Sequence, residues 1–298
     1  MHRKLMVFGS ILAVAAPMLG AANTPQSNLS AAQIVDKNVA ARGGLQAWRA
    51  VQTMSEEGKM GVGGNQRATI QVPMPNKDVK MPGAARPKEE VKLPFAMDLE
   101  RPRKSRFELK FKGQTAVQVY DGTNGWKLRP YLNRLEVEPY SQDELKLASM
   151  QTDFDGPLID YASKGIKVEL DGIEKVEDRD CYKLKLTMSD GRTVHDWIDA
   201  QSFLEAKIEG QPRRLDGKVH PVEVYYRDYR AVNGLQIPYV LETKVLPVGT
   251  TARGFQDAPV PAERITIEKV VVNPKLDASL FSKPEVAAAS NGKAPNGN

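Results

Sequence analysis

The chain has 298 residues, of which 41% are hydrophobic and 27% are charged, and it contains one cysteine. This composition excludes a disordered or collagen-like chain, and the single cysteine excludes a scaffold held together by internal disulfides. The net charge of +5 is spread along the chain. Because nucleic-acid binding requires a concentrated basic stripe, we expect no nucleic-acid partner.

The first 22 residues have the pattern of an export signal. Arg3 and Lys4 precede an apolar run over residues 5–16, and small residues then lead to Ala22. The run is too short to span a bilayer. We expect cleavage after Ala22 and a soluble periplasmic protein, with an uncleaved anchor as the alternative. The residue directly after Gly20 is alanine and not cysteine, so lipid anchoring is not expected.

Three domain ranges follow from this: a signal peptide over residues 1–22, one domain over 23–284, and a disordered tail over 285–298. A β-rich domain of this size can bury a single core. The tail is mostly Ala, Ser, Asn and Gly, a composition typical of disordered chain ends. The stretches 73–92, rich in Pro and Lys, and 247–261, rich in Gly and Pro, are predicted to be mobile loops.

Few helices are predicted. Ser30 and Gln33 have the spacing of a capping box before an apolar stripe that ends at Gly43-Gly44. Trp48 lies in a further short turn, where we expect it to dock this helix onto a sheet, with ligand contact as the alternative. Only residues 141–150 and the turn at 157–164 also have helical character.

Most of the remaining chain has the period-two pattern of strands with one buried face. Phe107, Leu109 and Phe111 alternate with charged residues, and similar runs occur at 166–170, 182–188, 222–226 and 265–267. Dipeptides that accept positive φ, such as Asp171-Gly172 and Asn233-Gly234, predict hairpin turns between the runs. The chain is therefore expected to form an antiparallel meander of about ten strands.

Such a sheet has more apolar surface than three short helices can cover. Either the sheet closes into a barrel, or it curls around the helices and leaves a lined hollow. Both arrangements favour an apolar cavity, whose natural ligand is a hydrophobic molecule.

Motifs for catalysis and cofactor binding are missing from the sequence. It has no nucleophile elbow, P-loop, dinucleotide-binding glycine motif or zinc-protease motif. His195 and His220 have no metal-ligand partner at suitable spacing, and Cys181 is expected to be a small strand residue, with a reactive thiol as the alternative. We expect no enzyme, no cofactor and no metal site; an enzyme acting on a lipid is the remaining alternative.

Several segments of residues 30–284 resemble the outer-membrane lipoprotein-sorting family, the LolA/LolB-like periplasmic proteins. The clearest is Val-Tyr-Asp-Gly-Thr-Asn-Gly-Trp at 119–126. The other segments are 41–45, 101–108, Pro130, 155–161 with Lys164-Gly165, 228–229 with Asn233-Gly-Leu235 and Pro238, and 273–281. Their order and spacing carry the resemblance.

The resemblance implies a mainly β fold: a curled antiparallel sheet, or unclosed β-barrel of about eleven strands, with short helices as a lid on the concave face. It also implies a function in which acyl chains of a lipid or lipoprotein occupy the cavity, with membrane-bound donor or acceptor proteins as further partners. We therefore predict a carrier or binding protein. The alternative is a sensor on the same fold, which binds a hydrophobic signal and regulates a protein partner.

The candidate ligand-binding residues are apolar. Five are expected on the concave face, in contact either with a ligand or with the lid helices: Phe107, Leu109, Phe111, Val117 and Val119. Trp126 either lines the cavity mouth or packs in the core beside a hairpin. Phe95, with Met74 and Met81 in the neighbouring Pro-rich loop, forms either an adaptable apolar entrance or part of a solvated loop. Trp48 completes the set.

Overall fold

The computed structural model describes residues 29–62, 90–130, 134–150, 154–215, 217–249 and 260–285. The predicted signal peptide (1–22), nearly all of the 73–92 loop with Met74 and Met81, most of the 247–261 loop, and the tail after residue 285 lie outside the described residues.

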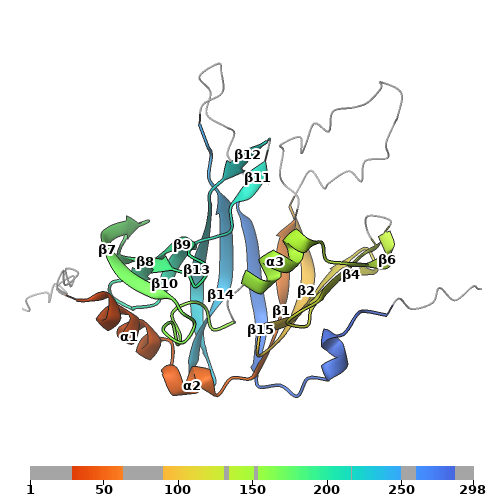
Figure 1. The fold of residues 1–298 in the computed structure, drawn as a ribbon, viewed down its shortest axis with the longest axis horizontal. Helices are drawn as coiled ribbons and strands as arrows, with labels where there is room; N and C mark the ends of the chain where they lie inside the picture. The colour runs from red at the N-terminus through yellow and green to blue at the C-terminus, as the bar shows by residue number, and fades with distance from the viewer. Residues whose placement is uncertain are drawn as a thin grey trace, which may run out of the picture.

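The architecture is one antiparallel sheet with the α-helices on one face (Figure 1). Thirteen strands are joined in the order β6-β5-β4-β3-β2-β1-β15-β14-β13-β10-β9-β8-β7. Their bounds are β1 (Thr53–Val62), β2 (Val91–Glu100), β3 (Lys104–Phe111), β4 (Gln114–Tyr120), β5 (Gly125–Arg129), β6 (Arg134–Pro139), β7 (Lys167–Val176), β8 (Arg179–Thr187), β9 (Thr193–Asp199), β10 (Glu205–Glu209), β13 (Val222–Val232), β14 (Leu235–Val245) and β15 (Glu263–Val272). A separate pair is formed by β11 (Arg213–Leu215) and β12 (Lys218–His220).

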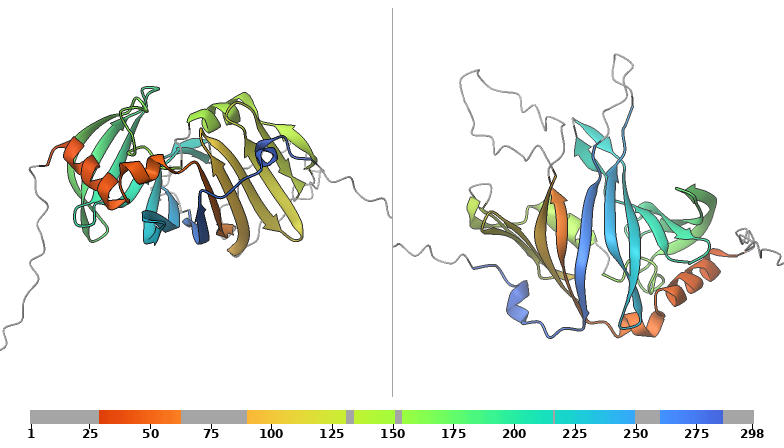
Figure 2. Two further views of the ribbon diagram at one scale, coloured as in Figure 1. Left: turned by 90° about the horizontal axis from the view of Figure 1, so that it is seen from below. Right: turned by 180° about the vertical axis from the view of Figure 1, so that it is seen from behind.

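The sheet curls but does not close, because its end strands β6 and β7 do not pair with each other. The view from below in Figure 2 shows its two outer parts turned toward the same side, with α1 (Ala31–Ala41) against one and α3 (Gln142–Met150) against the other. The short helix α2 (Leu45–Arg49) and a series of turns over residues 154–165 lie between them. The mainly β fold with an unclosed sheet is thus confirmed; the sheet has thirteen strands where ten or eleven were expected.

The helices begin where the sequence predicts. Ser30 Oγ accepts a hydrogen bond from the Gln33 backbone N–H, and the Gln33 side chain accepts one from the Ser30 N–H, which completes the capping box of α1. Ser141 and Glu144 make the same reciprocal pair before α3. Among the described residues, no helix combines the length and hydropathy needed to cross a membrane.

Strand register decides which side chains face the helices. Met54 pairs with Leu99, Phe95 with Leu109, and Met97 with Phe107 across β1, β2 and β3. These residues belong to a core cluster with Trp48 and Ile159, which come from the helical side. A second cluster on the same face packs Ile34 and Val35 of α1 against Tyr182, Leu184, Leu186 and Ile198. The concave face therefore carries two apolar clusters, one in each part of the sheet.

The prediction that Val117 and Val119 share this face with Phe107 is wrong. Across the β3–β4 hairpin Phe107 pairs with Gln118, while Val117 pairs with Glu108 and Val119 with Arg106. The two-residue Lys112-Gly113 turn sets this register, so odd-numbered residues of β3 share a face with even-numbered residues of β4. Val117 and Val119 are buried on the convex face, the side on which the 3-10 helix η2 (Ala278–Phe281) packs against β3.

One predicted hairpin turn is a bulge instead. Asp171-Gly172 lies inside β7, where the pairing with β8 shifts register between Leu170 and Ile173. Gly172 has φ +117°, a conformation that glycine adopts at bulges as well as at turns. Asn233-Gly234 does form the predicted turn, between β13 and β14.

Candidate functional site

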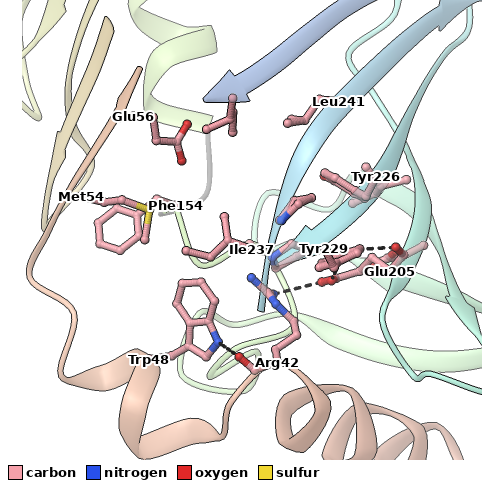
Figure 3. Close-up of a pocket in the computed structure, with 16 residues that line it drawn as sticks. Arg42, Trp48, Met54, Glu56, Phe154, Glu205, Tyr226, Tyr229, Ile237 and Leu241 are labelled. Carbon is pink, nitrogen blue, oxygen red and sulfur yellow. Dashed lines mark hydrogen bonds and ion pairs between the residues drawn. The ribbon is translucent and has the colours of Figure 1, made fainter. Parts of the chain in front are cut away.

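A cavity of about 250 Å³ lies at the centre of the concave face, between the two apolar clusters (Figure 3). It is bounded by α2, by β1, β15, β14, β13, β10 and β9, and by the turn at 154–157. Its lining residues are Arg42, Trp48, Met54, Glu56, Phe154, Gly156, Pro157, Asp196, Glu205, Ile208, Tyr226, Tyr229, Ile237, Pro238, Leu241 and Ile267. More than half of these are apolar, and the polar ones carry the chemistry described below.

The apolar wall is formed by Trp48 from α2 and by strand residues such as Met54, Ile237 and Ile267. All four are buried, with Trp48 only 2% exposed. The Trp48 indole N–H donates to the Arg42 carbonyl oxygen at 3.0 Å, which satisfies the one polar atom of this side chain. The Arg42 guanidinium in turn lies 4.6 Å from the Trp48 ring centroid.

Arg42 owes its position to the glycine that follows it. Gly43 has φ +112°, and a Cβ atom there would lie 2.5 Å from the Gly234 carbonyl oxygen. Only glycine therefore lets the β13–β14 hairpin approach the end of α1 this closely. The Gln236 backbone N–H donates to the Arg42 carbonyl at 3.1 Å and closes the contact.

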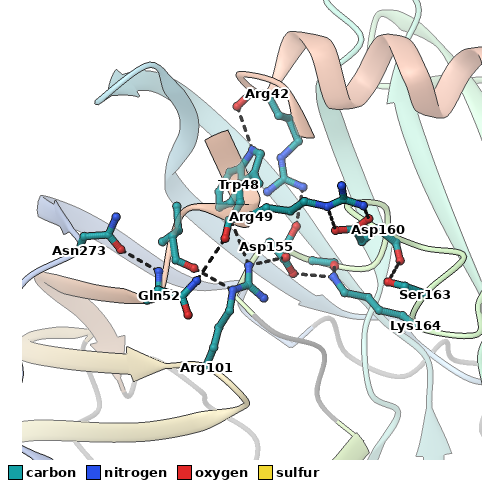
Figure 4. Close-up of polar contacts among 12 residues, drawn as sticks. Arg42, Trp48, Arg49, Gln52, Arg101, Asp155, Asp160, Ser163, Lys164 and Asn273 are labelled. Carbon is teal, nitrogen blue, oxygen red and sulfur yellow. Dashed lines mark hydrogen bonds and ion pairs between the residues drawn. The ribbon is translucent and has the colours of Figure 1, made fainter. Parts of the chain in front are cut away.

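The turn that roofs the cavity is held by buried ionic contacts around Asp155 (Figure 4). Asp155 is 2% exposed; its two carboxylate oxygens accept hydrogen bonds from Arg101 and Lys164, each at 2.6 Å. Its carbonyl oxygen accepts a hydrogen bond from Arg42 at 2.8 Å. Arg101 comes from the β2–β3 turn and also donates to the Val51 carbonyl at 2.8 Å. The roof is thus tied to the sheet and to both N-terminal helices.

The polar wall contains one complete ion pair. Arg42 and Glu205 approach to 3.0 Å, with side chains only 7% and 8% exposed. The Tyr229 hydroxyl donates to Glu205 Oε2 at 3.2 Å. Burial, together with the charge of Glu205, raises the pKa of Tyr229 well above its usual value, so this hydroxyl stays protonated and remains a donor.

Asp196 lies on the same wall, and no cation among the described residues forms an ion pair with it. Its side chain is fully buried, and within the described part of the chain neither carboxylate oxygen has a hydrogen bond of normal geometry. Burial, and then the nearby charge of Glu205, raise its pKa well above the usual range, although Arg42 and the Trp197 backbone N–H favour the charged form. Glu205 and Asp196 also raise the pKa of Tyr226, after desolvation, so these side chains share one polar corner.

Glu56 is a further carboxyl in the cavity lining, contributed by β1. No hydrogen bond or ion pair joins it to another described residue. It is half-buried, and protein surrounds the carboxyl on most sides. Desolvation raises its pKa to about 7.

The predicted site residues divide between the two faces. Trp48 lines the cavity, while Phe95, Phe107 and Leu109 belong to the adjoining apolar cluster. Phe111 follows them on β3 in the same phase and is half-buried. Val117, Val119 and Trp126 lie on the convex face. There Trp126 lines a shallow depression with Lys104 and Phe281, not the concave cavity. Contact of any of these residues with a ligand stays a prediction.

The polar residues of the cavity were not predicted, although the sequence carries a signal for some of them. Asp196 lies in phase with Val194 and Ile198 on a half-apolar strand, and Glu56 lies in phase with Met54. An acidic residue on the buried phase of a strand is costly unless its carboxyl is hydrogen-bonded or ion-paired, so such a position is unusual. His195, by contrast, faces away from the cavity and contacts Glu209 at 3.0 Å. In the described residues no cluster of His, Cys, Asp and Glu could hold a metal ion.

The chain is similar to several solved structures. No family model matches the chain, and no curated protein matches it. Among solved structures, it is similar to a LolA superfamily protein from Nitrosomonas europaea, with 13% identity, a TM-score of 0.49, and coverage of 86% of this chain and 98% of that chain.

Two further solved structures are similar over comparable lengths. A putative outer membrane lipoprotein-sorting protein domain from Vibrio parahaemolyticus has 11% identity and a TM-score of 0.48, covering 84% of this chain and 95% of that chain. A DUF1329 family protein from Desulfovibrio piger has 12% identity and a TM-score of 0.47, covering 84% of this chain and 96% of that chain.

Proposed function

We propose that the protein is a non-enzymatic periplasmic carrier or binding protein that holds acyl chains of lipids or lipidated proteins against the concave face of its sheet. The observation that carries this proposal is the lined hollow at the centre of that face. Trp48, Met54, Ile237 and Ile267 form its apolar wall. Membrane-bound proteins that deliver or receive the ligand are the partners that this function requires.

The size of the cavity limits what it holds. About 250 Å³ lies just below the range of about 300–1,000 Å³ typical of small-molecule sites, so it accommodates part of one acyl chain. The adjoining side chains Met60, Met97, Leu99, Phe107 and Leu109 are apolar and only partly buried. We place the rest of the acyl chain along this apolar surface, which continues from the Met54 side of the cavity across β2 and β3.

The energetic need for such a protein is large. Exposing a buried methylene to water costs about 0.8 kcal/mol, so a lipid with some forty methylenes faces a barrier on the order of 30 kcal/mol. Unassisted passage through an aqueous compartment is therefore negligible. A preformed hollow lowers this barrier. Because only a few ionic contacts hold the roof, the hollow can open to release the lipid.

Mass spectrometry of solvent extracts from the protein, purified without detergent from its own cells, tests the proposal directly. A lipid or lipopeptide present in stoichiometric amount is the expected result. An empty protein that also fails to take up an added fluorescent fatty acid would contradict the carrier function and favour an interaction module.

A substitution that fills the hollow gives a sharper test. Leu241 is a half-buried residue of the cavity lining on β14, so Leu241→Trp occupies cavity space while keeping the wall apolar. We expect uptake of a fluorescent fatty acid, measured by titration, to weaken by about tenfold, as loss of one or two buried methylene contacts predicts. The control is Val271→Trp on the exposed, opposite phase of β15, which should leave uptake unchanged. Equal effects of the two substitutions would contradict a binding site at the cavity.

A further inference from the structure

Acidic groups outnumber basic groups in the described lining of the cavity. Among the described residues, Arg42 is the one cation of the lining, and Glu205 already neutralises it at 3.0 Å. Asp196 and Glu56 are two additional carboxyl groups, and no ion pair joins either to a cation among the described residues. The lining therefore holds two carboxyl groups for which a cationic ligand would be the missing partner.

Asp196 is the decisive member of this set. Its side chain is fully buried, it lines the cavity, and both of its carboxylate oxygens lack hydrogen-bond partners in the described part of the chain. Buried polar atoms in folded proteins are almost always hydrogen-bonded, and an exception requires an explanation. A ligand that donates hydrogen bonds from the cavity side supplies one.

We propose that this polar corner binds the ammonium group of an amine-bearing amphiphile, whose hydrocarbon chain lies against the wall formed by Trp48 and Met54. This inference rests on the proposed function and names the chemical class of the ligand. An ammonium has three N–H donors and no acceptor. Asp196 offers two acceptor oxygens, and the Tyr226 hydroxyl, which has no hydrogen bond to any described residue, offers a third.

Other headgroups fit the corner less well. An anionic head would meet two unpaired carboxyl groups, and the guanidinium of Arg42 is already shared between Glu205 and the Asp155 carbonyl. A neutral hydroxyl can exchange hydrogen bonds with the protonated acid, but it brings no charge to stabilise the carboxylate. Charge-assisted hydrogen bonds are also about twice as strong as neutral ones. The ammonium is the head that matches both the charge and the acceptor count.

Binding of an ammonium is linked to proton release. The titratable and charged groups around Asp196 in the lining are Arg42, Glu205, Tyr226, Tyr229 and, on β1, Glu56. Because burial and Glu205 raise the pKa of Asp196, the empty cavity favours the protonated acid. An arriving ammonium stabilises the carboxylate, so the proton of Asp196 passes to the buffer while the amine keeps its own.

The test compares two probes of equal chain length, dodecylamine and dodecanol, on the full protein stripped of bound lipid. We expect dodecylamine to bind about tenfold more tightly than dodecanol at neutral pH. Asp196→Asn should remove this preference and leave dodecanol affinity within about twofold. The control Glu209→Gln removes one negative charge from β10 on the convex face, where Glu209 contacts His195; it should leave the preference intact.

The possible results separate the two proposals. If neither probe binds, the carrier function fails and this inference fails with it. If both bind equally to the native protein, or if Asp196→Asn keeps the preference, the ammonium site alone is overturned. Calorimetry of dodecylamine binding to the native protein, in buffers of different ionisation enthalpy, adds a test that needs no variant. Proton release supports the site, and its absence contradicts it.

Discussion

Asp155→Asn is expected to lower the free energy of unfolding by about 3 kcal/mol. The substitution keeps the size of the side chain but places an uncharged amide between Arg101 and Lys164, whose nitrogens each lie 2.6 Å from the carboxylate oxygens. Both cations are 19% exposed at the side chain, so water only partly replaces the lost contact. Urea unfolding followed by circular dichroism measures the loss.

Asp160→Asn is the matched control within the same turn. Asp160 makes a bidentate pair with Arg49, with distances of 2.7 and 2.6 Å, but half of the Arg49 side chain is exposed. Exposed ion pairs contribute less than about 1 kcal/mol. Asn also tolerates the positive φ of +53° at this position. Similar losses for the two variants would show that the Asp155 contacts do not hold the roof.

The roof contacts also explain why residues far apart in the sequence act on one site. Asp155 accepts hydrogen bonds from Arg42, Arg101 and Lys164, which come from the C-terminal end of α1, from the β2–β3 turn and from the roof itself. If the roof opens to admit an acyl chain, these are the contacts that break. Asp155→Asn should therefore also speed exchange of a bound fluorescent fatty acid, measured by stopped-flow displacement.

The sequence predicted the architecture well because period-two patterning and capping boxes are local signals. The in-phase run Phe107, Leu109 and Phe111 does mark a strand of the concave face. Faces across a hairpin were harder to assign, because the register between β3 and β4 depends on the turn at Lys112-Gly113 rather than on either strand. Val117 and Val119 are apolar and in phase with each other, and nothing within their strand shows that they face η2 instead of the cavity.

The candidate site was predictable only in its apolar part. Trp48 was identified because a tryptophan after a capped helix needs a packing partner. The pairing of Arg42 with Glu205 joins positions 163 residues apart, and no local pattern contains it. Asp196 and Glu56 had a local signal, since each is an acidic residue on the buried phase of a strand, but that signal indicates only that the position is unusual. The cavity that explains both residues exists only once β1 and β9 face it together.

Glu56→Gln is expected to stabilise the protein at alkaline pH and to leave its stability unchanged near pH 4. Desolvation raises the folded-state pKa of Glu56 from 4.5 to about 7. Between these values the folded protein holds a proton that the unfolded chain has lost, so stability falls as pH rises through this window. Gln removes the titration. The gain above the window is up to about 3 kcal/mol, reduced by water that reaches the cavity.

Urea unfolding at several pH values between 4 and 8 measures the effect as a difference between native protein and variant. The control is Glu57→Gln, one residue along β1, whose side chain is 58% exposed and pairs with Lys269 at 2.9 Å. Because Glu57 points to the opposite face, its substitution should not change the pH dependence. A gain from Glu56→Gln that is the same at every pH would mean that better packing, rather than removal of a desolvated charge, stabilises the variant. The cavity would then be less dry than the raised pKa of Glu56 implies, and its hold on an acyl chain correspondingly weaker.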